Sequence, residues 1–135
     1  MKAPPRVGTT GELEFKVDAS QTVHFVEEGM PPVLGTPWLV SFLEAAARAV
    51  LAPLLEAGES SVGVEIEVQH LAPTPPGHRV RCVARVAAVD GPRVAFHVEA
   101  WDECELIARG FHRRHLVNAF RFTRAVGKKT KGAVP

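Results

Sequence analysis

Tyrosine is absent from this chain of 135 residues, and cysteine occurs only twice. Cys82 and Cys104 cannot build a disulfide framework, and neither lies in a cluster with metal-ligand spacing. The cysteine content predicts a reducing cytoplasm. Because the histidines lack zinc-ligand spacing and no nucleotide-binding glycine motif is present, we expect neither a metal nor a cofactor. Asparagine and glutamine are scarce while prolines number 11, a combination that favours a thermophilic source.

A strong net charge and a long apolar run are also missing. The formal net charge is +1, which excludes electrostatic binding to nucleic acid as the main role. No apolar run approaches the roughly 20 residues of a membrane span, and the first residues have no apolar core of a secretory signal. We expect one globular domain with its own core and no membrane partner.

Charge is distributed unevenly along the chain. Residues 118–135 contain five of the 16 basic residues and none of the 15 acidic ones. The pattern predicts a domain over residues 1–120 and a basic tail over residues 121–135, with a mobile end over the last eight residues. The tail is either a solvated end or an arm that helps to hold a phosphorylated ligand or a partner subunit.

A single long helix is predicted after a loop rich in proline and glycine. Thr36 is a good N-cap and Pro37 suits the first helical position. The stretch 38–56 is rich in Ala and Leu and is apolar around most of its circumference, which is typical of a buried helix. Pro53 is expected to distort its last turn.

Apolar residues alternate with polar ones on both sides of this helix. A strand is predicted at 12–18, and further strands at 61–71, 78–89, around 94–100 and at 106–117. In the strand 61–71, the residues assigned to one face are Val62, Val64, Ile66, Val68 and His70, with Gly63 on the other. The order predicts an α+β fold in which a curved antiparallel meander wraps one helix. One layer leaves apolar surface, so a homodimer is expected.

Glu44 is the first candidate for chemistry. It is the only ionisable residue between Thr36 and Ala47 and lies among apolar neighbours. A carboxylate in such a helix is paired, protonated or functional, because an isolated buried charge is costly. The alternative is an edge position from which Glu44 reaches water or Arg48.

Polar residues also end two of the predicted inward faces. His70 follows Val68 in phase at the end of its strand, as either a site residue or a hydrogen-bonded core histidine. His112 and Arg114 end another inward face, which indicates a polar pocket or simply an exposed strand end. Thr36 precedes Glu44 by eight residues, about 12 Å along a helix. A joint role would need the substrate between them or the copy from a second subunit.

The segment 33–80 resembles the fluoroacetyl-CoA thioesterase family of hotdog-fold proteins. The marks are T-P-W-L-V-S-F-L-E, A-P-L-L-E-x-G-E-x-S-V-G and V-x-H-L-A-P-T-P-P-G, and the resemblance extends from about residue 6 to residue 120. It implies a hotdog fold, a dimer or possible tetramer, and hydrolysis of acyl-CoA thioesters. The family's residues fall on catalytic Thr36, Glu44 and His70, on the substrate-binding Gly63, and on Arg114 near the substrate.

One segment departs from the family pattern. Members specific for fluoroacetyl-CoA carry a longer segment with phenylalanines before the helix, whereas this chain has E-E-G-M-P-P-V-L-G. We therefore expect a small acyl group with a broader or different specificity. Glu44 would act as nucleophile or as general base, with backbone amides near Gly63 or at Trp38 stabilising the oxyanion. The alternatives are an acyl-CoA-binding protein without turnover and a hotdog hydratase or dehydratase.

Overall fold

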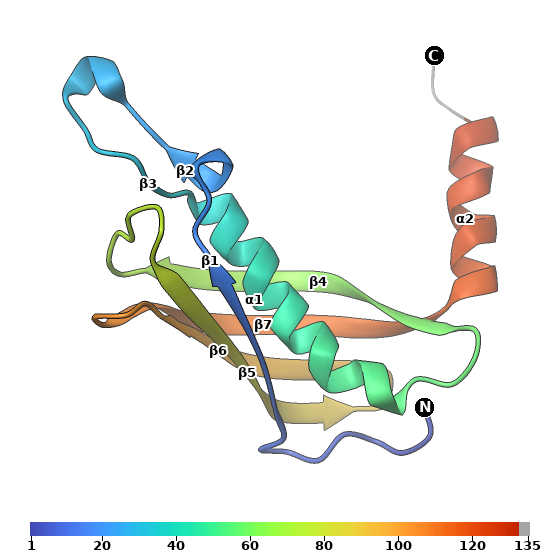
Figure 1. The fold of residues 1–135 in the computed structure, drawn as a ribbon. Helices are drawn as coiled ribbons and strands as arrows, with labels where there is room; N and C mark the ends of the chain where they lie inside the picture. Colours follow the sequence, from blue (N-terminus) through green and yellow to red (C-terminus); the bar gives the residue numbers. More distant parts are fainter. Residues whose placement is uncertain (133–135) are drawn as a thin grey trace.

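The computed structural model describes residues 1–132, which form a five-stranded sheet, a small two-stranded sheet, one long helix and a separate terminal helix (Figure 1). The elements in chain order are β1 (Thr10–Lys16), η1 (Ala19–Gln21), β2 (Thr22–Val23), η2 (Val26–Glu28), β3 (Val33–Leu34), α1 (Thr36–Leu51), η3 (Ala52–Leu54), β4 (Glu59–His70), β5 (Arg79–Asp90), β6 (Arg93–Trp101), β7 (Leu106–Asn118) and α2 (Ala119–Lys131).

The main sheet is antiparallel and has the order β1-β5-β6-β7-β4. Helix α1 lies across one face of it, and the small β2-β3 sheet lies at the N-terminal end of α1 (Figure 1). The predicted α+β architecture is confirmed. The predicted meander is right for β5, β6 and β7 but wrong for β4, which pairs with β7 at the far edge. The connection over residues 71–78 is too long for a tight hairpin and carries the chain across the sheet.

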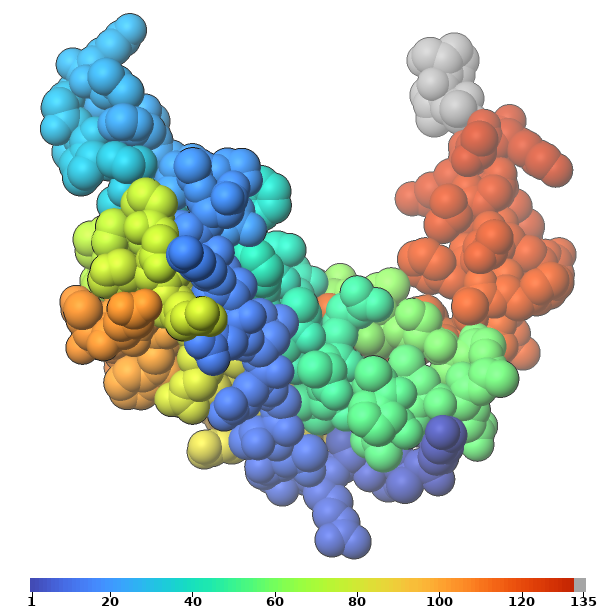
Figure 2. Space-filling view, viewed as in Figure 1, coloured from blue at the N-terminus to red at the C-terminus, as the bar shows by residue number. Residues whose placement is uncertain are grey.

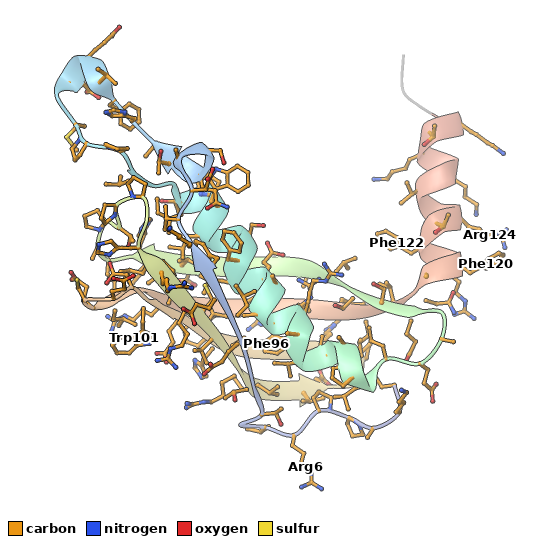
Figure 3. The ribbon with its side chains drawn as sticks, viewed as in Figure 1. Arg6, Phe96, Trp101, Phe120, Phe122 and Arg124 are labelled. Carbon is orange, nitrogen blue, oxygen red and sulfur yellow. The ribbon has the colours of Figure 1, made fainter. Side chains whose placement is uncertain are left out.

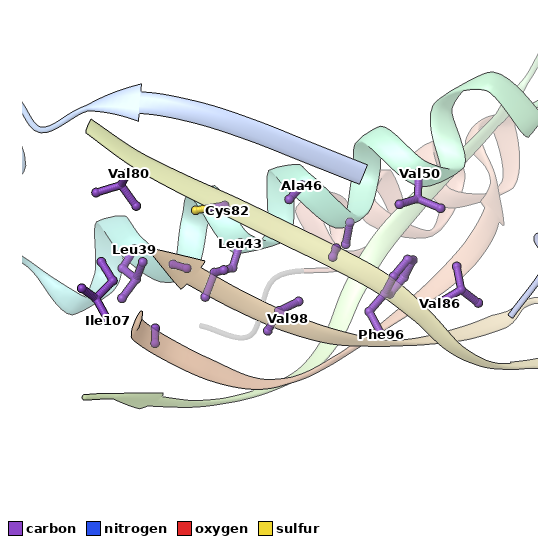
Figure 4. Close-up of a cluster of buried hydrophobic side chains, with 14 of the residues drawn as sticks. Leu39, Leu43, Ala46, Val50, Val80, Cys82, Val86, Phe96, Val98 and Ile107 are labelled. Carbon is purple, nitrogen blue, oxygen red and sulfur yellow. The ribbon is translucent and has the colours of Figure 1, made fainter. Parts of the chain in front are cut away.

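The core lies between α1 and the sheet (Figure 4). The predicted inward residues of β5 and β6 are buried there, among them Val80, Cys82, Phe96 and Val98. The prediction that α1 is buried all round is wrong within one chain, since Trp38 on its other side is 46% exposed. The expectation that no apolar run approaches a membrane span is wrong by length and composition alone, because the segment Thr36–Leu54 is long and apolar enough for one. Its packing on the sheet is that of the central helix of a globular domain.

A β-bulge in β4 changes which of its residues face α1. The register of β4 against β7 slips between Gly63 and Glu65, and Val64 is exposed. The predicted continuous face from Val62 to His70 is therefore wrong. One extra residue reverses the alternation, so Ser61 and Gly63 share the helix-facing side with His70.

The N-terminal end of α1 differs from the prediction, whereas its C-terminal end agrees with it. Gly35, not Thr36, is the N-cap, and it provides no side-chain cap. The Thr36 hydroxyl is bound to another residue instead. At the other end, Pro53 does distort the last turn, because α1 stops at Leu51 and residues 52–54 continue as the 3-10 turn η3.

Helix α2 was not predicted. The Asn118 side chain caps it by accepting from the Arg121 amide at 3.0 Å, and the expected boundary between residues 120 and 121 falls inside it. The expected mobile end begins at residue 128, which is helical to Lys131, while residues 133–135 lie outside the described part. Figure 2 shows α2 and residues 19–34 as two arms that rise on opposite sides of a concave surface.

Candidate active site

The Glu44 carboxylate is held by a buried arginine. Arg114 is 4% exposed and its Nη1 lies 3.3 Å from Glu44 Oε2. The same guanidinium donates through Nε to the Ser61 hydroxyl at 2.9 Å and through Nη2 to the Ser61 carbonyl at 3.0 Å. Burial lowers the pKa of Arg114, against the attraction of Glu44. A guanidinium fixed on three sides is a rigid positive support for the carboxylate.

His112 completes this cluster from the adjacent position on the inward face of β7. It is 1% exposed, and its Nδ1 lies 2.8 Å from the Glu65 carbonyl. A carbonyl only accepts, so Nδ1 carries the proton and Nε2 accepts from Arg114 Nη1 at 3.1 Å. Burial lowers the pKa of His112 below its ordinary value of 6.5. His112 is therefore a neutral acceptor that fixes the arginine at physiological pH.

Gly63 leaves the space that the Glu44 carboxylate occupies. A Cβ atom at this position would lie 2.6 Å from Glu44 Oε2, 3.1 Å from His112 Cε1 and 3.3 Å from Arg114 Nη1. These separations are shorter than van der Waals contact. Only glycine permits the carboxylate to lie this close to β4.

A second pair of site residues lies at the N-terminal end of α1. Thr36 Oγ1 and His70 Nδ1 are 2.8 Å apart. His70 Nε2 is buried without a hydrogen-bond partner among the described residues. Burial lowers the pKa of His70 below 6.5, with a smaller opposing effect of the Ala72 backbone. A neutral imidazole with one free nitrogen is suited to accept or deliver a proton.

Two hollows accompany these two groups. One of about 420 Å³ is lined by Thr36, His70 and mainly apolar residues: Val23, Val33, Leu34, Pro37, Leu71, Ala72 and Pro73. The other, of about 490 Å³, is lined by Pro37, Val40, Ser41, Glu44, Ala45, Arg48, Ser61, Val62, Gly63 and Arg114. Pro37 borders both. The first hollow is apolar enough for an acyl chain, and the second offers a carboxylate at its wall.

The structure thus brings the five predicted residues together in two groups rather than one. Glu44, Gly63 and Arg114 form the first, and Thr36 and His70 form the second. The Trp38 amide was an expected oxyanion donor, but it donates to the Gly35 carbonyl at 3.1 Å, as the next amide also does at 3.2 Å. That expectation is wrong, because both amides are used in the hydrogen bonds of the first turn of α1 to the N-cap carbonyl.

Two members of the Glu44 group were missed as site residues. The alternation of inward and outward residues in β7 places His112 on the inward face beside Arg114. This pattern was sufficient to include His112 among the predicted site residues. Ser61 gave no such signal, because the bulge that turns it inward is not visible in the sequence. Within residues 1–132, no group of three or more His, Cys, Asp or Glu side chains is placed to hold a metal ion.

A partly exposed carboxylate, a neutral histidine and a hydroxyl at the walls of two adjoining hollows, one of them apolar, can perform general-base or nucleophilic chemistry on an acyl group. Comparisons with known proteins agree with this chemistry. The sequence profile described as "FlK: Fluoroacetyl-CoA-specific thioesterase" matches residues 17–119. The fluoroacetyl-CoA thioesterase of Streptantibioticus cattleyicolor is 36% identical over 136 residues, which cover 96% of this chain and 98% of that protein.

Solved structures show the same fold. A Thermus thermophilus protein described as a thioesterase superfamily member has a TM-score of 0.85 and 36% identity, with 96% of this chain and 95% of that one covered. A mutant of FlK in complex with acetyl-CoA has a TM-score of 0.85 and 34% identity, covering 93% and 98%. Fold and relatives define a thioesterase of the hotdog class. Within that class, the chain belongs to the family of the fluoroacetyl-CoA thioesterase FlK.

Proposed function

We propose that this protein hydrolyses a small acyl-CoA thioester to the free acid and coenzyme A. The observation that carries the proposal is Glu44, whose side chain is 35% exposed at the wall of a hollow while Arg114 holds its Oε2. A purely structural ion pair would have no need of an accessible oxygen. The relatives named above are a fluoroacetyl-CoA thioesterase and a protein solved with acetyl-CoA bound, which supports a CoA ester as the substrate class.

Glu44 starts the reaction by one of two routes. As general base it takes a proton from water, whose oxygen bonds to the thioester carbonyl carbon. As nucleophile it bonds to that carbon itself and forms an anhydride that water then cleaves. In both routes the C–S bond breaks and the sulfur leaves with the electron pair. In the base route His70 relays the proton from Glu44 to the departing sulfur. In the nucleophile route the sulfur leaves as a thiolate and receives, through His70, the proton released when water cleaves the anhydride. In both routes Thr36 orients His70 through their hydrogen bond.

The proposed active form is a homodimer. The side of α1 that carries Trp38, Ser41 and Arg48 is uncovered in one chain, and the twelve-residue strand β4 lies at the edge of the sheet with an open ladder. Antiparallel pairing of β4 with its copy would cover both. We further propose that Glu44 of one subunit meets Thr36 and His70 of the other, since the two groups lie about 12 Å apart along one helix.

The acyl group is proposed to lie in the hollow lined by Thr36 and His70. Its apolar lining suits a short hydrocarbon chain, and its wall includes Val33 and Leu34, which belong to the segment before the helix that is short in this chain. This supports a small acyl group with a range not confined to fluoroacetyl. A cytoplasmic location and a thermophilic source stay predictions from composition.

The test is thiol release from a panel of short, long and aryl acyl-CoAs, with Glu44→Ala and the exposed-residue control Glu56→Ala measured alongside. Removal of the base is expected to lower kcat by about 10²–10⁴, while the control keeps full activity. A loss below about tenfold would exclude Glu44 as base or nucleophile. Calorimetric binding of CoA esters without any turnover would instead indicate an acyl-CoA-binding protein. After a single turnover in ¹⁸O-water, label in Glu44 would identify the anhydride route with water attacking the Glu44 carbonyl carbon, because the base route never breaks a bond to a Glu44 oxygen.

A further inference from the structure

Helix α2 carries an apolar stripe that none of residues 1–132 covers. None of its residues is buried. Phe122 and Val126 are four positions apart on one side, and Phe122 points toward the concave surface while Phe120 and Arg124 point away from it (Figure 3). The helix has five basic residues and no acidic one. An amphipathic helix of this kind requires a partner for its apolar side.

The opposite arm has the complementary composition. We call residues 19–34 the N-terminal lobe. Four of its large apolar side chains are exposed, namely Val23, Phe25, Val26 and Met30. Its charged residues are Glu27 and Glu28, with no lysine or arginine. Apolar surface and negative charge on the lobe therefore match apolar surface and positive charge on α2. Within one chain the two arms lie on opposite sides of the concave surface (Figure 2).

A second copy brings the two arms together. Strand β4 begins at Glu59, which is paired with Asn118 at the base of α2, and ends at His70, which binds the first residue of α1 next to the lobe. Antiparallel pairing of β4 with its copy sets the Glu59 end of one strand beside the His70 end of the other. The two-fold axis of such a ladder stands normal to the sheet, so both copies present α1 on the same side.

We infer that α2 of each subunit docks on the N-terminal lobe of its partner, with the stripe of Phe122 and Val126 against the lobe's apolar side chains. The inference rests on the dimer proposed above and adds a partner for α2. Val23, Val33 and Leu34 belong to the lobe and line the hollow that contains His70. Docking of α2 therefore holds the partner's lobe over the partner's acyl hollow, and each active site depends on a helix from the other chain.

Cross-linking between two different variants tests the docking directly. In a Cys104→Ser background, Val26→Cys and Val126→Cys proteins are mixed, allowed to exchange subunits and treated with a short flexible bis-maleimide. Both positions are well exposed, at 66% and 50%. We expect a covalent dimer from the mixture and little from either variant alone. Val7→Cys, which is 68% exposed near the opposite edge strand β1, replaces Val26→Cys in the control mixture and is expected to give none.

Charge reversal provides a second measurement. On a helix with 100° per residue, Lys129 borders the stripe of Phe122 and Val126, whereas Lys128 lies on the other side. Lys129→Glu is expected to raise KM at least threefold, and Lys128→Glu to leave it unchanged. Combining Lys129→Glu with Glu27→Lys and Glu28→Lys is expected to restore KM.

The outcomes separate this inference from the proposed function. A dimeric, active protein whose variants cross-link no better than the control overturns the docking alone. An intrachain cross-link in the double-cysteine protein overturns it too, as does binding of α2 to phosphatidylserine vesicles without a cross-link. A monomer by light scattering overturns both the dimer and the docking, while an inactive dimer that still cross-links overturns only the proposed function.

Discussion

Thr36 and His70, 34 positions apart, are joined by a hydrogen bond of 2.8 Å between Oγ1 and Nδ1. Because Gly35 is the N-cap of α1 and makes no side-chain cap bond, the Thr36 hydroxyl has no part in starting the helix. Its partner His70 keeps its other nitrogen, Nε2, free of hydrogen bonds within the described residues. Thr36 therefore determines how the His70 ring is oriented, and which nitrogen faces a substrate.

The first prediction concerns this hydroxyl. Thr36→Val removes the hydrogen bond at nearly constant shape and is expected to lower kcat by about tenfold or more, the equivalent of one hydrogen bond of about 1.4 kcal/mol. Thr36→Ser keeps the hydroxyl and is expected to retain most activity. Thermal unfolding of both variants should match that of the parent protein. A drop in melting temperature with unchanged kcat would point to a helix-capping role instead.

The second prediction concerns the space above Gly63. Gly63→Ala places a Cβ atom 2.6 Å from Glu44 Oε2, so the carboxylate must move, and a displacement of about 1 Å can cost about 10² in rate. We expect that loss in kcat with near-normal folding by circular dichroism. Gly127→Ala in α2 meets no atom within 4 Å and serves as the matched control with unchanged kcat. Full activity of Gly63→Ala would mean that the observed position of Glu44 is not the reactive one.

The third prediction tests whether a site is shared between subunits. Glu44→Ala and His70→Ala proteins are each expected to be inactive. If Glu44 acts on a substrate held by the partner's His70, then a mixed dimer contains one site with both groups intact. Subunit exchange between the two variants should restore up to half of the parental rate per mixed dimer. Activity that stays absent after verified exchange would place both groups of one site in a single chain.

The fourth prediction follows from the two buried histidines. The pKa values of His70 and His112 lie below 6.5 in the folded protein, chiefly because burial disfavours the imidazolium. The unfolded chain therefore binds more protons at mildly acidic pH, so the free energy of unfolding is highest above pH 6.5 and decreases as the pH falls below it. The carboxyls of Asp18, Glu59 and Asp102 affect stability at more acidic pH than the two histidines do, since hydrogen bonds lower the pKa of these carboxyls.

Denaturant unfolding at several pH values between about 5 and 7.5 measures this effect. His112→Gln is expected to be less stable than the parent at neutral pH but to show a weaker decrease toward pH 5. His24→Gln, which replaces an exposed histidine, is expected to keep the parental pH dependence. The assignment to His112 is wrong if all three proteins lose stability equally with pH.

The alternation of apolar and polar residues, together with helix propensity, was sufficient to predict most of the fold. The inward residues of β5 and β6, the long helix and its distortion at Pro53 follow from local patterns. The place of β4 beside β7 does not, because strand pairing is decided by long-range packing that no local pattern records. Helix α2 was missed for another reason: the basic composition of the segment resembled a solvated end, and only its capping residue Asn118 signalled a helix.

The candidate site was predictable in its residues but not in its arrangement. Glu44 stood out as a charge in an apolar helix, and Arg114 as a polar end of an inward face. That these two meet, with His112 and Ser61 around the guanidinium, depends on the β7–β4 pairing and on the bulge. The separation of eight positions between Thr36 and Glu44 was a correct indication that one straight helix keeps them apart.

Because of the bulge at Val64, the site forms only when the separation between Gly63 and His70 in the sequence is an odd number of positions. Gly63 and His70 are seven positions apart, an odd number, and in a regular strand they would face opposite sides of the sheet. The extra residue makes both face α1. Deleting or inserting one residue between them would turn one of the two groups outward, whereas a change of two residues would preserve both orientations. We expect lengths in this part of β4 to vary among functional sequences only in steps of two.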